Sequence, residues 1–419
     1  MAKPTSVSDF LAGLLDLRKS SNDLDDRSIA ELCEALLSTE GQVSGRRIAA
    51  ALLARYQSMD EAGKHAFFTH LNDAWDVAPA QIKELAAQYD EAPTPENFAA
   101  LVTAAEPRRQ ELFRRLNQAE GATAALVQMR VDLLDYVRDD PNLRRTDLDL
   151  VHLLTSWFNR GFLVLRQITW STPANILEKI VAYEAVHEIK DWEDLRRRLH
   201  PEDRRCFAFF HPAMPEDPLI FVEVALTKDI PGSIQNVLAE DRETLDIDAA
   251  RTAVFYSISN CQQGLAGISF GNLLIKQVAS ELSTQLPHLK TFVTLSPIPL
   301  LRKWQAQQSL ETLPVDTDLA AHYLLNARRE DGFPYDPVAR FHLGNGALIH
   351  AVHEEADTTD KGKAQSGGVM VNYLYDLSQT ERNHESFALN HTIAASRALQ
   401  QKARSMGQRL NTQKTETSK

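Results

Sequence analysis

The sequence predicts an α+β protein, with an all-helical N-terminal domain followed by an α/β domain. Three observations lead to this prediction. The chain has 419 residues, which is too long for one ordinary hydrophobic core. Up to about residue 160, apolar residues recur at three- and four-residue spacing, which is typical of helices. Beyond that point, short β-branched and aromatic segments alternate with helical patterns, which indicates a sheet accompanied by helices.

The N-terminal region is expected to be helical almost throughout. Leu126, Met129, Leu133 and Val137 illustrate the spacing that places apolar side chains on one face of a helix. Several prolines, which are favoured in the first turn of a helix, stand near the expected helix starts. The expected helical segments span residues 25–37, 45–56, 63–75, 98–102, 108–116 and 123–137.

The C-terminal region carries candidate strands separated by helical patterns. Residues 252–259 (TAVFYSIS) and 289–295 (LKTFVTL) look like buried strands, because β-branched and aromatic residues dominate them. The polar tail after Arg404 is expected to be frayed. The other expected strands span residues 206–210, 219–226, 346–353 and 369–374, and the expected helices span 272–282, 319–328 and 393–403.

These patterns divide the chain into three parts. Residues 1–162 form the helical domain and residues 163–405 form the domain that mixes strands and helices. Residues 406–419 form the polar C-terminal tail. The helices of the first domain need partners to bury their apolar stripes.

The composition narrows the classes of function. It is that of a soluble globular protein, with 43% hydrophobic and 24% charged residues. A formal net charge of -12 argues against a nucleic-acid partner, which would need a strongly basic face. The three cysteines, Cys33, Cys206 and Cys261, lie far apart and form no CxxC pair, so a zinc ribbon or a disulfide framework is not expected.

The sequence carries no recognisable targeting signal. No stretch approaches the roughly 18 uninterrupted apolar residues of a membrane span. The first residues contain a short apolar run interrupted by acidic side chains, which makes a poor signal peptide. The chain ends in Thr-Ser-Lys, one residue short of an SKL-type peroxisomal address. We therefore expect a cytoplasmic protein.

A glycine-bearing segment at residues 262–272 (QQGLAGISFGN) follows one expected strand and precedes an expected helix. Glycines let backbone amides approach an anion, and the N-terminus of a helix adds partial positive charge. The segment matches neither the Walker A loop nor the dinucleotide fingerprint. A phosphate cradle and a plain strand-to-helix turn are equally compatible with this pattern.

Ser296 stands at the end of an expected buried strand, just before Pro297 and Pro299. The prolines end the strand and fix the backbone, so the serine is held at a strand end. Ligands bind at such ends in open α/β sheets. On the sequence alone, a Ser-Pro turn without a functional role is the more common outcome.

His342 comes just before an Asn-Gly turn, and histidine is the natural proton donor or acceptor near neutral pH. Because the chain has thirteen histidines, most of them must be structural or exposed. His350 and His353 follow closely, but their odd spacing would place them on opposite faces of a strand. No cysteine or carboxylate spacing completes a metal site, so none is expected.

Tyr373 and Tyr375 share one face of an expected strand, from which a phenol could reach a ligand. An aromatic pair in the core is an equally good interpretation. Lys361 and Lys363 offer basic charge in the preceding loop, although an ordinary solvated turn is the simpler reading. There is no G-x-S-x-G motif, so a conventional serine hydrolase is not indicated.

Taken in order, several short segments resemble the malonyl-CoA decarboxylase family over nearly all of residues 165–405. Each segment is unspecific by itself, whereas the ordered set is specific. The segments span residues 168–170, 185–187, 204–206, 224–227, 255–259, 262–265, 274–276, 295–299, 341–343, 345–347 and 372–373.

The resemblance implies an N-terminal helical bundle used in oligomerisation, in a homotetramer, and a C-terminal domain similar to the GNAT acyltransferase fold. It also implies that Ser296 and His342 are the catalytic pair and that Tyr375 lines the site. Some members carry a glutamate where this chain has Ser269, which puts a supporting carboxylate in doubt. The residues implied to contact malonyl-CoA are Ala266, Gly267, Ile268, Ser269, Phe270, Gly271 and Asn272.

The reaction implied is conversion of malonyl-CoA to acetyl-CoA and CO2, a step in malonate and fatty acid metabolism. The thioester carbonyl is the electron sink, so no cofactor is expected. His342 is expected to protonate the enolate carbon while Ser296 hydrogen-bonds the reacting group and orients the histidine.

Two alternatives stay open, a CoA-dependent acyltransferase and a non-catalytic malonyl-CoA sensor, because the fold alone does not dictate the fate of a thioester. Lys276, Lys361 and Lys363 are candidate contacts for the adenine or 3′-phosphate of coenzyme A.

Overall fold

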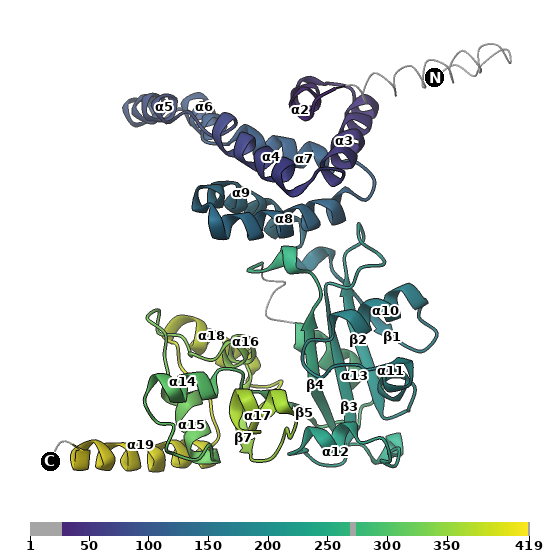
Figure 1. The fold of residues 1–419 in the computed structure, drawn as a ribbon, viewed down its shortest axis with the longest axis vertical. Helices are drawn as coiled ribbons and strands as arrows, with labels where there is room; N and C mark the ends of the chain where they lie inside the picture. Colours follow the sequence, from purple (N-terminus) through teal and green to yellow (C-terminus); the bar gives the residue numbers. More distant parts are fainter. Residues whose placement is uncertain (1–26, 269–273, 418–419) are drawn as a thin grey trace. The chain divides into compact units, whose positions relative to one another are not determined.

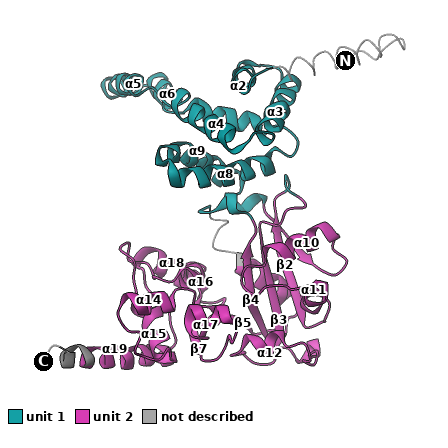
Figure 2. Ribbon diagram, in the orientation of Figure 1, with its two compact units in different colours: residues 1–162, 212–214, 262–268 teal, residues 163–211, 215–261, 269–419 magenta. Residues whose placement is uncertain are grey.

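The structure is a computed structural model that describes residues 27–268 and 274–417 (Figure 1). The chain divides into two compact units (Figure 2). The first comprises residues 1–162, 212–214 and 262–268, and the second comprises residues 163–211, 215–261 and 269–419. The main division therefore falls at residue 162, where the sequence changes from helical to mixed patterns. Within the described residues, no helix is both long and apolar enough to cross a membrane.

The first unit is built from helices, as its apolar spacing predicts. Side-chain caps fix the starts of some of them: Ser28 and Glu31 form a reciprocal capping box, and Asp60 accepts a hydrogen bond from the backbone N–H of Gly63. The described helices are α2 (Ile29–Ser38), α3 (Gln42–Gln57), α4 (Glu61–Ala74), α5 (Pro79–Glu91), α6 (Pro95–Ala104), α7 (Arg108–Leu116), α8 (Ala122–Asp139) and α9 (Arg144–Trp157), with short 3-10 turns at Pro141–Leu143 and Arg160–Phe162.

A buried ion pair accompanies the apolar core of this unit. Arg109, from α7, is 2% exposed, and its Nε lies 2.5 Å from Asp149 Oδ2 of α9. Its Nη2 lies 3.1 Å from Asp76 Oδ1, so the buried guanidinium faces two carboxylates. Such a charge is tolerated in a core only when it is paired and hydrogen-bonded in this way.

The second unit is organised around a mixed sheet. Strands β1 to β4 are antiparallel neighbours, β5 runs parallel to β4, and β8 is antiparallel to β5, β6 and β7. The strand order is β1-β2-β3-β4-β5-β8-β6, with β7 paired to β8. The strands are β1 (Val164–Ile168), β2 (Arg204–Phe210), β3 (Ile220–Thr227), β4 (Thr252–Asn260), β5 (Thr291–Thr294), β6 (Ser296–Pro297), β7 (Leu348–His353) and β8 (Met370–Leu374).

Helices cover both faces of the first strands. Alternate residues of β2, Cys206, Ala208 and Phe210, pack with residues of α10 and α11. The intervening Phe207 and Phe209 belong to a larger core with residues of α13, α15, α16 and α19. Side chains of a strand alternate between its two faces, so β2 contributes to a hydrophobic core on each side of the sheet. The helices of this unit are α10 (Ala174–Tyr183), α11 (Trp192–Leu199), α12 (Ile234–Leu238), α13 (Leu274–Gln285), α14 (Leu301–Gln307), α15 (Thr317–Asn326), α16 (Pro337–Gly344), α17 (Asp360–Ser366), α18 (Thr380–Asn390) and α19 (Arg397–Thr417).

The predicted fold class is confirmed, since a helical N-terminal region precedes a domain with a mixed sheet. Each of the six expected strands corresponds to a strand of the structure, with differences of a few residues at the ends. Strand β1 was missed, because its exposed polar residues show no clear apolar face. The helices that were not predicted individually are α5, α9, α10, α11, α12, α14, α16, α17 and α18.

The C-terminal tail corrects another prediction. Helix α19 continues to Thr417, whereas the sequence led us to expect a frayed tail after Arg404. Met406 is 1% exposed and belongs to the main core, and Leu410, one turn later, packs against that core. Arg409 also pairs with Asp316 at 3.4 Å. Two apolar residues four positions apart are enough to hold the helix against α15 despite its polar composition (Figure 1).

We predict that Met406→Ala destabilises the protein by about 2–5 kcal/mol, because it removes a fully buried side chain and leaves a cavity. Thermal unfolding of the variant and of the wild-type protein measures the effect. Ser405→Ala, at the neighbouring exposed position, is the matched control. Equal transition temperatures for the two variants would show that this end of the helix is not packed.

Candidate active site

Three side chains proposed from the sequence meet in the second unit. Ser296 comes from β6, His342 from α16, and Tyr375 directly follows β8. Ser296 Oγ lies 3.1 Å from His342 Nε2, and Tyr375 Oη lies 2.8 Å from His342 Nδ1. All three residues are buried, with at most 5% of their surface exposed. The imidazole is therefore hydrogen-bonded through both of its nitrogens.

The local sequence explains why Ser296 is held in place. Strand β5 ends at Thr294, and the chain then forms the two-residue strand β6, in which Ser296 pairs with Val371 and Pro297 pairs with Met370. Proline is acceptable there because β6 lies at the end of the strand order. Ser296 thus lies just beyond the end of β5, as expected, but it begins a separate short strand that includes Pro297, whereas the prolines were expected to end the strand. Strand β8 fixes its backbone from one side.

Helix α16 positions His342 in its last turn. Asp336 caps the helix by accepting hydrogen bonds from the backbone N–H groups of Val338 and Ala339, and Pro337 occupies the first turn. The expected Asn-Gly turn ends the helix. Gly346 has a φ of +82°, and a Cβ there would lie 2.1 Å from the backbone oxygen of Thr380, so only glycine fits.

Both tyrosines of the predicted pair contact the histidine. The Tyr373 ring stacks on the His342 ring with centroids 4.4 Å apart and planes inclined by 23°. Tyr375 approaches edge-on and makes the hydrogen bond to Nδ1. Tyr373 Oη is buried and has no hydrogen-bond partner among the described residues. The two tyrosines thus hold the imidazole ring by stacking and by hydrogen bonding.

Burial decides the charge state of this site. Desolvation lowers the pKa of His342 from its usual value to about 3, and burial raises the pKa of the Tyr375 phenol well above its ordinary range. Both groups are therefore neutral at pH 7. A neutral imidazole can donate a proton to a strong base and can polarise a carbonyl, as a hydrogen-bond donor.

A small cavity of about 240 Å³ opens beside the serine and the histidine. Most of its lining is apolar, and no lysine, arginine or carboxylate lines it among the described residues. Ser296, His342 and Asn260 are its polar side chains. The remaining lining residues are Val186, Phe255, Tyr256, Ile258, Pro297, Pro337, Val338 and Phe341.

The wall of the cavity at Val186 is held by the half-buried carboxylate of Glu184. Glu184 accepts hydrogen bonds from the hydroxyls of Ser257 and Ser259, on β4, and from the backbone N–H groups of Val186 and His187. Four donors on one carboxylate fix the loop after α10 to the edge of β4. Lys361 adds a further hydrogen bond, from Nζ to the backbone oxygen of Ala185 at 2.6 Å.

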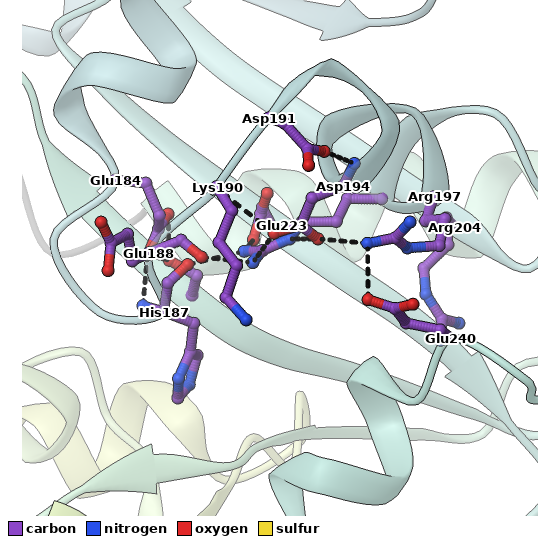
Figure 3. Close-up of polar contacts among 12 residues, drawn as sticks. Glu184, His187, Glu188, Lys190, Asp191, Asp194, Arg197, Arg204, Glu223 and Glu240 are labelled. Carbon is purple, nitrogen blue, oxygen red and sulfur yellow. Dashed lines mark hydrogen bonds and ion pairs between the residues drawn. The ribbon is translucent and has the colours of Figure 1, made fainter. Parts of the chain in front are cut away.

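The other end of this loop is held by Arg198, from α11. Figure 3 labels the neighbouring residues Glu188, Asp194 and Glu223. The Arg198 guanidinium donates to the backbone oxygens of His187 and Glu188 and pairs with Asp194 and with Glu223 of β3. Burial raises the pKa of Glu223 to about 8, and the charge of Glu184 acts in the same direction while Arg198 opposes it. The loop that carries Val186 is thus fixed by these polar groups and by Ile189, which packs in the core with residues of α10 and α11.

The predicted malonyl-CoA loop is only partly described. Its first part belongs to the first unit, where Arg130 Nη1 of α8 donates to the backbone oxygens of Gly264 and Ala266 at 2.7 and 2.9 Å. A Cβ on Gly264 would lie 1.9 Å from the backbone oxygen of Val127, so the close approach requires glycine. Gly267 and Ile268 follow, with Gly267 at a φ of +78°. Ser269, Phe270, Gly271 and Asn272 lie outside the described residues.

Two of the three basic residues suggested for the coenzyme, Lys276 and Lys361, have partners within the chain. Lys276 Nζ pairs with Glu381 at 2.5 Å, and Lys361 binds backbone oxygens as described above. Lys361 and Lys363 lie in α17 rather than in a loop, which corrects the predicted turn. His353 Nε2 lies 2.5 Å from Asn372 Oδ1, and within the described part of the chain no group of three metal-ligating side chains exists.

Thr294 was missed in the sequence. Its Oγ1 lies 2.8 Å from Ser296 Oγ and 3.1 Å from the backbone nitrogen of Tyr373. A signal was available, because residues two apart in a strand share a face and Thr294 precedes Ser296 by two positions. Asp336 was also missed, although an aspartate before a proline is a usual helix start.

Comparisons with known proteins agree with one another. A family model of the malonyl-CoA decarboxylase N-terminal domain matches residues 75–158, and one of the C-terminal domain matches residues 161–316 and 305–416. The mitochondrial malonyl-CoA decarboxylase of Anser anser anser is 36% identical over 345 residues, covering 69% of this chain and 68% of that protein.

Solved structures give the same result. The crystal structure of malonyl-CoA decarboxylase from Rhodopseudomonas palustris has a TM-score of 0.84 at 49% identity and covers 89% of this chain and 98% of the other. The corresponding structure from Agrobacterium vitis has a TM-score of 0.84 at 47% identity and covers 90% and 99%.

We predict that burial of His342 makes the protein sensitive to acid. Because the folded-state pKa is lowered, the unfolded chain binds a proton between about pH 6.5 and 3 that the folded protein does not. The stabilisation that comes from keeping His342 neutral is fully present above about pH 6.5. As the pH falls below that value, the free energy of unfolding decreases by up to about 1.4 kcal/mol per pH unit. His342→Gln removes this contribution, so urea unfolding from pH 7 to 4 should show a weaker pH dependence in that variant.

The matched control for this measurement is His152→Gln, at an exposed histidine of α9. If the pH dependence of His342→Gln equals that of the wild-type protein, the imidazole is not held neutral by burial.

Proposed function

The chain belongs to the malonyl-CoA decarboxylase family, and from that premise we propose that it converts malonyl-CoA to acetyl-CoA and CO2 with His342 as proton donor and Ser296 as the hydrogen-bonding partner that orients it. One observation carries the assignment of roles. A neutral, fully buried imidazole bonded to both Ser296 and Tyr375 lines a mostly apolar cavity. This arrangement suits a reaction whose intermediate is a strong base.

The chemistry requires little beyond placement and hydrogen bonding. When the bond between the α carbon and the carboxylate breaks, its electron pair moves into the adjacent thioester and CO2 leaves. The thioester carbonyl accepts these electrons, so the resulting enolate needs donors near its oxygen and a proton at its carbon. For this reason we expect turnover without an added cofactor.

His342 supplies the proton to the α carbon. Its neutral form is sufficient, because an enolate is a far stronger base than the imidazolate left behind. The hydrogen bond from Tyr375 to Nδ1 keeps the ring in one orientation, and Ser296 contacts the nitrogen on the cavity side. A proton from Tyr375 or from solvent restores the imidazole after each turnover.

The apolar wall of the cavity favours the departure of CO2. A carboxylate in such surroundings loses hydration without gaining an ion pair, whereas CO2 carries no charge. Val338 and Phe341, from α16, and Ile258, from β4, are part of this wall. The carboxylate is thus less stable in the site than the product that replaces it.

Assembly and location stay predictions. The family resemblance implies a homotetramer formed through the helical region. A cytoplasmic location is likewise a proposal, and the relatives include mitochondrial proteins.

We expect Ser296→Ala and His342→Gln each to lower turnover by about 10²–10⁴-fold, because the first removes the hydroxyl that orients the imidazole and the second removes the acid itself. Acetyl-CoA formation measures turnover, and calorimetric titration with coenzyme A measures binding, which should be retained. Ser283→Ala, at a half-buried serine of α13, is the control. Turnover near the wild-type level in either site variant would remove the assigned role.

We expect Val338→Lys to slow CO2 release roughly tenfold while lowering KM, because an ammonium beside the cavity stabilises the carboxylate before it leaves. Val338→Met adds similar length without charge and is the matched variant. Steady-state kinetics with malonyl-CoA compare the two. Identical kcat values for both would argue that the apolar wall has no part in the reaction.

A further inference from the structure

Thr294 occupies a central place beneath the catalytic pair. Its residue is 0% exposed, at the end of β5. Ser296 Oγ donates a hydrogen bond to Thr294 Oγ1 at 2.8 Å, and the backbone N–H of Tyr373 donates to the same oxygen at 3.1 Å. The backbone oxygen of Thr294 in turn accepts a bond from Asn372 Nδ2 at 2.8 Å. Thr294 is therefore hydrogen-bonded to Ser296 and to two residues of β8, Asn372 and Tyr373.

Ser296 is the donor in its hydrogen bond with Thr294, and this sets the direction of the bonds that follow. A threonine hydroxyl has two acceptor lone pairs, and both are used here, by Ser296 and by the Tyr373 amide. A serine hydroxyl has a single hydrogen. Since Ser296 gives that hydrogen to Thr294, it has none to give to His342.

The direction of this hydrogen bond determines which nitrogen of His342 carries the hydrogen. The 3.1 Å contact between Ser296 Oγ and His342 Nε2 must then be a bond in which Nε2–H donates. In a neutral histidine the other nitrogen carries no hydrogen, so Nδ1 accepts from the Tyr375 hydroxyl at 2.8 Å. The chain of donors therefore runs from Tyr375 through His342 and Ser296 to Thr294.

The same threonine also supports the stacking partner of the histidine. Its Oγ1 holds the amide of Tyr373, whose ring lies 4.4 Å from the His342 ring. Thr294 Oγ1 thus contacts both the Ser296 hydroxyl, which faces His342 Nε2, and the backbone of Tyr373, whose ring stacks on the imidazole. This double role sets Thr294 apart from the other buried hydroxyls of the sheet.

We propose that Thr294 is a positioning residue that keeps the Ser296 hydroxyl turned away from His342 and thereby holds the imidazole as its Nε2–H tautomer, with the transferable proton on the cavity side. The inference rests on the proposed function, because it specifies how that site is made ready to protonate an enolate. It also separates the site from Ser-His hydrolases and acyltransferases, in which the histidine accepts the serine proton and the serine becomes a nucleophile.

The tautomer itself is the most direct test, because it needs no substrate and is read from the wild-type protein. In the protein labelled with ¹⁵N-histidine, the signals absent from His342→Gln identify the His342 nitrogens. We expect a protonated Nε2 and an unprotonated Nδ1 in the wild-type protein. A wild-type protein with its hydrogen on Nδ1 would overturn the inference.

Kinetics of matched variants test the consequence. Thr294→Val keeps the shape and removes both acceptor sites, and we expect a loss of roughly two- to tenfold in kcat with unchanged KM. Thr294→Ser retains the hydroxyl and should restore kcat to near the wild-type value. Thr252→Val, at a buried threonine of β4, is the control for replacing a hydroxyl in the sheet. A wild-type kcat in Thr294→Val would contradict the role.

The proposed function and the positioning role of Thr294 can be disproved independently of each other. If the wild-type protein does not decarboxylate malonyl-CoA, the proposed function is wrong whatever the Thr294 variants do. If it does, and His342→Gln abolishes turnover while Thr294→Val keeps the wild-type tautomer and kcat, only the positioning role is wrong. Thermal unfolding of each variant separates a damaged fold from an altered site.

Discussion

The hydrogen bond between Ser296 Oγ and His342 Nε2, buried away from water, is the interaction on which the rest of the site depends. The two residues are 46 positions apart in the sequence, and different parts of the fold hold each of them in place. Strand β8 fixes the serine through β6, while the Asp336 cap and the glycine turn after α16 fix the histidine. Tyr373 and Tyr375 then hold the ring itself. The sheet thus serves to bring together groups that the sequence keeps apart.

Burial has a chemical consequence as well as a structural one. It keeps the imidazole and the phenol neutral, and the apolar cavity beside them offers no counter-ion among the described residues. A site that must stabilise an anionic substrate would be poorly served by these features. A site in which a carboxylate leaves as CO2 and a carbanion takes up a proton benefits from them, because the charged ground state is disfavoured and the acid is already in place.

The sequence was informative where local physics dominates. Apolar spacing predicted the helical region, and β-branched runs predicted the central strands, because burial repeats with the period of the element. Ser296 at a strand end and the turn after His342 followed from proline and glycine. The roles of Ser296, His342 and Tyr375, in contrast, came from the family resemblance, since no spacing rule connects residues that only the tertiary fold brings into contact.

The errors have physical reasons of the same kind. Helix α19 extends past the expected end because tertiary packing of Met406 and Leu410 outweighs a polar composition. Lys361 lies in α17 rather than in the expected turn, and its ammonium binds the backbone that supports Val186. Thr294 was overlooked because its importance lies in the direction of a hydrogen bond, which depends on Tyr373 from a distant strand.

The most direct test of the central claim is to mix the purified wild-type protein with malonyl-CoA in D2O, without added metal or acyl acceptor, and to follow CO2 and acetyl-CoA. Decarboxylation followed by protonation predicts one CO2 for each acetyl-CoA, with one solvent deuterium in each new methyl group. Binding without turnover would contradict it and indicate a sensor, and turnover only with an added amine or alcohol would indicate an acyltransferase.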